Sequence, residues 1–249
     1  MIAGRRLLIL AFSLYLTPAW AQVSYEETHS IIRSFYDEYS PELTAQNSVL
    51  VINPAPSPDQ PDFWWNLDHT HASYSSVTTD EGILQHMLFI FGGFARMPGM
   101  TADSLMKTIC HEVGHGIGGA PFKKKQHKEL VSTEGQSDYF ATSSCLRRMF
   151  QRHPHIAKPS SRFVEQTCGA HFTSESELNY CYRAFTALEV DIQMFRQAYN
   201  VETSFELKDP TVVTEVNLEE TFYPSPQCRL DTSVAGVLNL ERPRCWWTP

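Results

Sequence analysis

The sequence predicts an α+β fold, because both helical and strand-like hydrophobic patterns occur along it. Apolar residues recur every three to four positions near the N-terminus, in the middle of the chain and near the C-terminus, as on one face of an amphipathic helix. A short apolar run bounded by glycines lies between the first two of these segments and has the length of a β-strand. Apolar and aromatic residues make up 42% of the 249 residues, which is enough to bury one core, so we expect one compact domain.

The N-terminal residues have the pattern of a secretory signal peptide. Two arginines precede an apolar stretch at 7–16, and small residues follow at Ala19 and Ala21. The apolar stretch is too short to span a bilayer, and no later stretch reaches the roughly 20 apolar residues that a membrane helix needs. We therefore expect a signal peptide over residues 1–21, a secreted or periplasmic domain over 22–249, and no membrane span.

The first half of the chain predicts one helix and one strand. Apolar residues at helical spacing predict a helix over 25–39, which we expect to end near Pro41. The proline-rich connector at 53–61 excludes regular helix and central strand. Aromatic and polar residues alternate without a clear period over 63–76, so no element is assigned there. The apolar run at 86–91 predicts a short strand, either inside the sheet or at its edge.

A helix with clear end signals occupies the middle of the chain. Thr101 is a suitable N-cap, and Asp103 favours the positive end of the helix. Several glycines from Gly116 onward, followed by Pro121, end the helix. We therefore expect this helix to run from Thr101 to about Gly116.

Two further helices are predicted in the second half. One covers about 132–151 and stops before Pro154, and the other covers 179–199. After Pro210 the hydrophobic period is lost, so we expect the remaining chain to be irregular.

All six cysteines follow the predicted signal peptide, and an even number in an exported chain predicts up to three disulfides. Six cysteines allow fifteen pairings, of which we predict Cys228 with Cys245, because both lie in a proline-rich tail that needs a cross-link. Cys110 precedes His111, but its side chain points about 100° around the helix from that histidine. This direction favours a disulfide or a core position for Cys110 over metal binding.

The chain is acidic, with a formal net charge of −8. Removal of the signal peptide and its two arginines takes this charge to about −10, which disfavours binding to nucleic acid. The basic cluster of Lys123, Lys124, Lys125 and Lys128 is short and interrupted. We interpret it as a solvated loop without a partner.

The middle helix contains the sequence His111-Glu112-Val113-Gly114-His115. Histidines four positions apart lie about 6 Å from each other on one face of a helix, so both rings can reach one tetrahedral metal ion. Glu112 lies beside them, and its carboxylate can accept a proton from a metal-bound water. The pattern indicates zinc as the cofactor.

A suitable third ligand follows on the next predicted helix. Glu134 and Asp138 are four positions apart and share a helix face. Glu134 can complete a site of two histidines and one glutamate. Asp138 can accept the other ring N–H of His111 or His115 and fix its tautomer. Two histidines with two carboxylates at this spacing favour a metal site over ordinary buried histidines.

The two motifs resemble those of the thermolysin-like, or gluzincin, zinc metalloproteases. In that family HExxH on one helix is followed by ExxxD on the next, as in HEVGH at 111–115 and EGQSD at 134–138. The resemblance covers about 30 residues closely, and it implies a zincin-like fold with a small mixed β-sheet, an active-site helix and a mostly helical C-terminal part. It implies that His111, His115 and Glu134 are the zinc ligands. It also implies that Glu112 is the general base and that Asp138 is the partner of His111.

The chain also departs from related patterns. Gly118 fits the start of the metzincin motif, but Pro121 stands at the position of that family's third histidine and cannot bind a metal. The family's oxyanion-stabilising residue has three candidate equivalents in this chain, which are His171, Tyr180 and Tyr182. In zincins an edge strand before the active helix pairs with extended substrate, and residues 88–93 could take this role or lie inside the sheet.

Two other features could carry chemistry. His69 and His71 could form a second metal pair, although histidines in a loop without a carboxylate are more often structural or exposed. Arg183 could meet a substrate carboxylate, although an ion-paired or surface position is favoured for it.

Taken with the resemblance, these residues predict a secreted zinc-dependent metalloendopeptidase. It would hydrolyse bonds in a peptide or protein substrate through a zinc-bound water activated by Glu112. The alternative is an exported zinc-binding protein without catalytic activity. Glu112 argues against that alternative, because a structural zinc site has no role for an unligated carboxylate at its open position.

Overall fold

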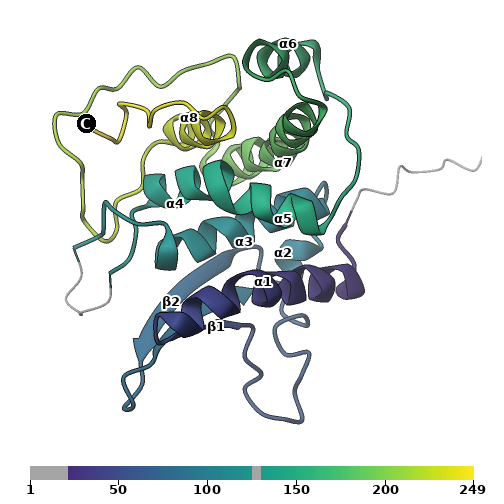
Figure 1. Ribbon diagram of the computed structural model, residues 1–249, viewed down its shortest axis with the longest axis vertical. Helices are drawn as coiled ribbons and strands as arrows, with labels where there is room; N and C mark the ends of the chain where they lie inside the picture. The colour runs from purple at the N-terminus through teal and green to yellow at the C-terminus, as the bar shows by residue number, and fades with distance from the viewer. Residues whose placement is uncertain (1–21, 125–129) are drawn as a thin grey trace, which may run out of the picture.

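The computed structural model describes residues 22–124 and 130–249, and its mixture of helices with a small sheet confirms the α+β class (Figure 1). The predicted signal peptide lies outside these residues. The elements, in chain order, are α1 Tyr25–Ala45, β1 Ser48–Ile52, β2 Ala72–Thr78, β3 Leu84–Ile90, α2 Gly92–Ala95, α3 Ala102–Ile117, α4 Glu134–Phe140, the π-helical turn η1 Ala141–Cys145, α5 Leu146–Arg152, α6 Arg162–His171, α7 Glu175–Tyr199 and α8 Pro226–Val237.

The sheet has three strands in the order β1-β3-β2. β1 pairs with β3 in parallel and β2 pairs with β3 in antiparallel, so the sheet is mixed, and β3 is its central strand. The strand predicted at 86–91 is therefore present but internal, which makes the edge-strand role considered for 88–93 wrong. The edge next to α3 is β2, in the segment that carried no sequence assignment.

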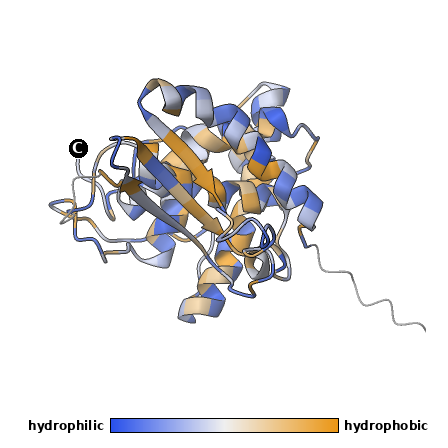
Figure 2. Cartoon of the chain, turned by 90° about the horizontal axis from the view of Figure 1, so that it is seen from below, coloured by the Kyte–Doolittle hydropathy of each residue, from blue (hydrophilic) through white to orange (hydrophobic). Residues whose placement is uncertain are grey.

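Helices pack in layers above the sheet. α1 and α3 contact the strands, and α4, α7 and α8 lie beyond α3, as Figure 1 shows. Figure 2 shows hydrophobic residues both in the sheet and on the helices. Alternate residues of β1 and β3 are buried in the core that these helices share with the sheet. α3 is thus enclosed between the sheet and the C-terminal helices.

α1 continues through Pro41, where the sequence predicts its end. A proline has no N–H for the carbonyl four residues earlier, which here belongs to Asp37. Arg152 on α5 donates a hydrogen bond to this Asp37 oxygen, with an Nη2–O distance of 3.4 Å. Because the lost partner is replaced, α1 extends for another turn and buries Leu43.

α3 has the predicted limits. The Thr101 hydroxyl accepts a hydrogen bond from the backbone N–H of Ser104 and so caps the helix, which ends at Ile117. The helix predicted at 132–151 is present as α4, η1 and α5 in succession. A disulfide between Cys110 and Cys145 joins α3 to η1, the turn that directly follows α4.

The C-terminal part is more helical than the sequence predicts. α7 begins four residues earlier than expected, at Glu175. The expectation that the chain is irregular after Pro210 is wrong for α8, where the Ser225 hydroxyl caps the first turn and Pro226 occupies it. α6 was also not predicted. No helix in the described part of the chain has the length and hydropathy of a membrane span.

The remaining cysteines form two further disulfides. One joins Cys168 on α6 to Cys181 on α7, and the other is the predicted pair of Cys228 and Cys245. Of this pair, only Cys245 lies in an irregular tail as expected, because Cys228 lies in α8. Three disulfides fit a protein of an oxidising compartment.

Candidate metal centre

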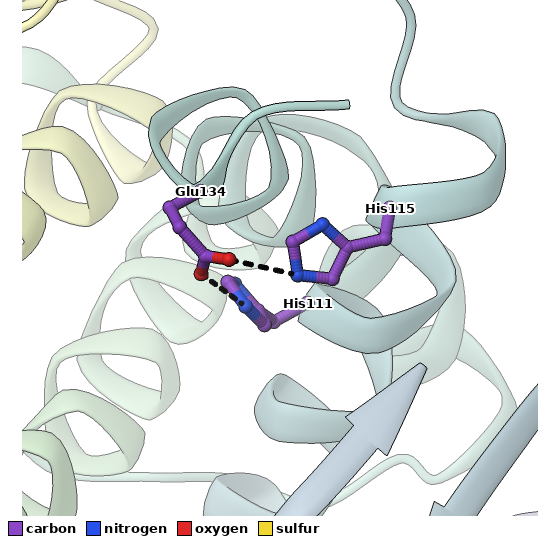
Figure 3. A group of neighbouring side chains, drawn as sticks. All are labelled: His111, His115 and Glu134. Carbon is purple, nitrogen blue, oxygen red and sulfur yellow. Dashed lines mark ion pairs between the residues drawn. The ribbon is translucent and has the colours of Figure 1, made fainter. Parts of the chain in front are cut away.

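His111 and His115 lie one turn apart on α3, and both side chains are buried. Their rings are neighbours, with centroids 4.8 Å apart. Glu134 is the first residue of α4, where the positive end of a helix favours a carboxylate. Figure 3 shows the carboxylate of Glu134 facing both rings.

The two distances from Glu134 to the histidine nitrogens are close to those between ligands of one metal ion. Nitrogen and oxygen ligands lie about 2.0–2.1 Å from zinc, so neighbouring ligand atoms should be about 3.3 Å apart. Glu134 Oε2 lies 3.4 Å from His111 Nε2, and Glu134 Oε1 lies 3.5 Å from His115 Nε2. The ligand atoms of all three residues lie within 4.8 Å of one another. The group can therefore hold a metal ion, and three protein ligands leave one tetrahedral position open.

An oxygen atom lies close to Nδ1 of each ring, which favours ligation through Nε2. Asp138 Oδ1 lies 2.8 Å from His111 Nδ1, and the Ser132 carbonyl oxygen lies 2.9 Å from His115 Nδ1. In a metal-bound state, these oxygens are placed to take up the proton of each Nδ1, which would leave each Nε2 free to bind the ion. Of the two histidines left open for Asp138, the structure selects His111.

The charges of the site are strongly coupled. Burial acts to lower the pKa of His111, but the carboxylate of Asp138 raises it to about 9. Burial, together with the positive charge of His111, lowers the pKa of His115 to about 3. Burial acts to raise the pKa of Glu134, but the hydrogen bond from His111 and the charge of His115 lower it well below its usual range. Burial raises the pKa of Glu112 to about 7.

Two cations that the sequence did not assign to the site also contact it. Lys123 Nζ donates to Glu134 Oε1 over 2.7 Å, and its side chain is only 9% exposed. Lys123 is therefore a partner of the site, and its interpretation as part of a solvated loop is wrong. Lys124 is exposed as expected, and Lys125 and Lys128 lie outside the described residues.

Arg229 on α8 is the second cation. Its Nε lies 2.7 Å from Asp138 Oδ2, and its Nη2 lies 2.9 Å from Asp138 Oδ1, which is the geometry of a bidentate pair. The same Nη2 lies 3.6 Å from Glu134 Oε2. Burial acts to lower the pKa of Arg229, but Asp138 raises it, and Asp138 in turn has a pKa below its usual range because of Arg229 and His111. No spacing rule could connect a residue this far along the chain with the motif.

A cavity of about 440 Å³ opens beside the three ligand residues. The edge strand β2 contributes Ala72, Ser73 and Tyr74 to its wall, and α3 contributes the face that carries Glu112. Other lining residues belong to α7 and α8 and to the segment before α8, and Tyr223 is one of them. Glu112 thus borders the same space as the ligands.

The three candidates for the oxyanion-stabilising residue lie elsewhere. His171 is exposed, Tyr180 is buried and donates to the Thr142 carbonyl, and Tyr182 packs against the core. None of these three described residues borders the cavity. The tyrosines that do border it are Tyr74, Tyr199 and Tyr223.

His69 and His71 are exposed, their ring centroids lie 5.7 Å apart, and His71 borders the cavity. Within the described ranges, the ligand group of α3 and α4 is the one that brings three metal-binding side chains together. Arg183 is buried and ion-paired, as the sequence favours.

A scan against models of known protein families, and searches of curated proteins and of solved structures, found no match to this chain. The chemistry of the site therefore rests on its residues and their geometry.

Proposed function

We propose that the chain is an exported zinc-dependent metallopeptidase of the gluzincin type, with a zincin-like domain over residues 22–249. One observation carries the proposal. The ligand atoms of His111, His115 and Glu134 lie within 4.8 Å of one another, and Glu112 borders the same cavity. Two nitrogen ligands and one carboxylate suit zinc, and the open fourth position suits a catalytic ion.

Each residue has a definite task in this proposal. A bound zinc ion would polarise the scissile carbonyl and lower the pKa of its water. Glu112 accepts a proton from the attacking water and passes it to the leaving amine. Asp138 holds His111 in the ligating tautomer, and Arg229 holds Asp138 in place.

Substrate would reach the site along β2. This strand is the sheet edge on the cavity side, and Ala72, Ser73 and Tyr74 border the cavity. An extended peptide can add to such an edge by backbone hydrogen bonding, which would bring its scissile bond past the ligands. The substrate is therefore a peptide or an unfolded segment of a protein.

The second candidate is an exported zinc-binding protein without catalytic activity. Structural zinc sites are closed by four protein ligands. Here three ligand residues and Glu112 border one cavity. This openness favours the peptidase.

The test compares wild type with Glu112→Gln, each as the purified chain from residue 22 onward. We expect one zinc per chain in both proteins, cleavage of a broad peptide mixture by wild type, and a rate at least about 100-fold lower in the variant. Glu165→Gln, an exposed change on α6, serves as the control and should cleave like wild type. Zinc binding without cleavage would favour the binding protein, and absence of bound zinc would rule out both candidates.

A further inference from the structure

Two ion pairs join α3 to α7, one turn apart on α3. Asp103 pairs with Arg183, and Lys107 pairs with Asp191. Both pairs link the same two helices, so either could serve to dock them. Their surroundings differ, and the difference points to separate roles.

The first pair is saturated and lies away from the cavity. Arg183 donates from Nε to Asp103 Oδ2 over 3.0 Å, from Nη2 to Asp103 Oδ1 over 2.7 Å, and from Nη1 to the Phe150 carbonyl over 3.3 Å. Both carboxylate oxygens of Asp103 and all three guanidinium nitrogens of Arg183 therefore take part in hydrogen bonds. This pair is sufficient to fix α3 against α7.

The second pair borders the cavity and has hydrogen-bonding capacity to spare. Lys107 Nζ donates to Asp191 Oδ2, and the two side chains are 6% and 11% exposed. An ammonium has three protons and a carboxylate two oxygens. Within the described residues, Lys107 Nζ has no second acceptor and Asp191 Oδ1 has no donor. A donor and an acceptor therefore stand side by side in the cavity wall.

The position of this pair relates it to the metal centre. Lys107 precedes His111 by four residues, so the two side chains lie about 6 Å apart on one face of α3. The apolar residues Phe94, Met194 and Phe195 border the same cavity. A substrate residue that flanks the scissile bond would place its side chain in this part of the cavity.

We infer that Lys107 and Asp191 form a specificity subsite for a primary amide, so that the enzyme cleaves next to glutamine or asparagine. The inference rests on the proposed function. An amide carries a carbonyl oxygen, which accepts from Lys107 Nζ, and an NH₂ group, which donates to Asp191 Oδ1. A single side chain thus meets both unused groups.

Other side chains fit this subsite less well. A carboxylate is attracted by Lys107 but repelled by Asp191, and an ammonium the reverse, so neither can pair with both groups. An apolar side chain covers the pair without supplying hydrogen bonds, and a polar site rejects a ligand that leaves its buried groups unpaired. The two charges cancel, so a neutral polar group is preferred.

The experiment uses one peptide series that differs only at a central position, which is glutamine, leucine, glutamate or lysine. Binding to zinc-loaded Glu112→Gln is measured by fluorescence anisotropy, and cleavage by zinc-loaded wild type is measured as kcat/KM. We expect the glutamine peptide to bind and to react at least about tenfold better than each of the others. Mass spectrometry should place the cut next to the glutamine.

Variants separate recognition from packing. Lys107→Met should reduce the ratio of kcat/KM for the glutamine and leucine peptides to about one. Lys107→Met/Asp191→Leu should do the same, and because it leaves no unpaired charge it can replace the single variant if that variant does not fold. Lys208→Met is the matched control, because it breaks a lysine–aspartate pair with Asp231 away from the cavity. It should keep the wild-type ratio.

The outcomes distinguish the two proposals. Equal values for glutamine and leucine peptides in wild type, or an equal loss for both in the variants, would overturn the subsite and leave peptidase activity standing. Selective binding of the glutamine peptide without cleavage would overturn hydrolysis and leave the subsite. Absence of both binding and cleavage would overturn the two together.

Discussion

At the scale of single residues, the centre combines ligands with charges that balance them. Glu134 faces Lys123 and Arg229 as well as two histidines, and Asp138 is shared between His111 and Arg229. The spacing of the motif predicts the ligands, because residues four apart on a helix share a face. Lys123 and Arg229 approach through tertiary packing, so no local pattern could identify them.

Asp138→Asn tests the role of the carboxylate behind the ligand. The amide can still contact His111 Nδ1, but it carries no charge to stabilise the ring or to balance Arg229. We expect zinc affinity to fall by about 10- to 100-fold, measured by competition with a chromogenic chelator. Asp80→Asn, an exposed change near the end of β2, is the control. Unchanged affinity in Asp138→Asn would show that the carboxylate does not support the metal site.

At the scale of elements, the sequence predicts long amphipathic helices well and short or unusual elements poorly. α3 and α7 have regular apolar faces and capping residues. β2 contains mostly small and polar residues and is only half buried, so it shows no alternation. α8 buries nearly its whole circumference, including Asp231 and Ser233, so it has no amphipathic period to detect.

The position of α8 depends on a glycine. A Cβ on Gly236 would lie 2.2 Å from Thr142 Oγ1 and 2.9 Å from the Tyr139 carbonyl oxygen, so α8 can cross η1 this closely only with a glycine there. Gly236→Ala should therefore destabilise the fold by about 1–3 kcal/mol in chemical denaturation. Because α8 carries Arg229, the variant should also bind zinc more weakly.

Gly169→Ala provides the comparison for this prediction. Gly169 lies inside α6, and its Cβ would meet no atom within 4 Å. Alanine favours a helix over glycine, so this variant should be neutral or up to about 1 kcal/mol more stable. Equal effects of the two alanine variants would contradict the close crossing.

At the scale of the whole molecule, the N-terminal helix is tied to the C-terminal layers through Glu38. Its carboxylate oxygens lie 2.5 Å from Arg148 Nε and 2.5 Å from Arg152 Nε, both on α5. Burial acts to raise the pKa of Glu38, but the two arginines lower it overall. The ion pairs thus stabilise the folded state while Glu38 is charged.

This arrangement predicts a pH dependence. A carboxylate whose pKa is lowered by folding stabilises the native state above the pKa of the unfolded chain, about 4.3 for glutamate, and loses that contribution as the pH falls through the lowered value. Wild type should therefore lose more unfolding free energy than Glu38→Gln between about pH 6 and pH 3. Denaturant titrations across this range provide the measurement, and parallel curves for the two proteins would contradict it. Glu165→Gln should follow wild type.

The distance along the chain between the ligands and Arg229 has a consequence for biosynthesis. The three ligands are translated close together, whereas the guanidinium that pairs with Asp138 comes 91 residues after it. Until α8 is translated, Asp138 has only His111 as a cationic partner, and burying its carboxylate is less favourable than in the complete site. The candidate ligands are therefore translated well before the guanidinium that completes their electrostatic environment.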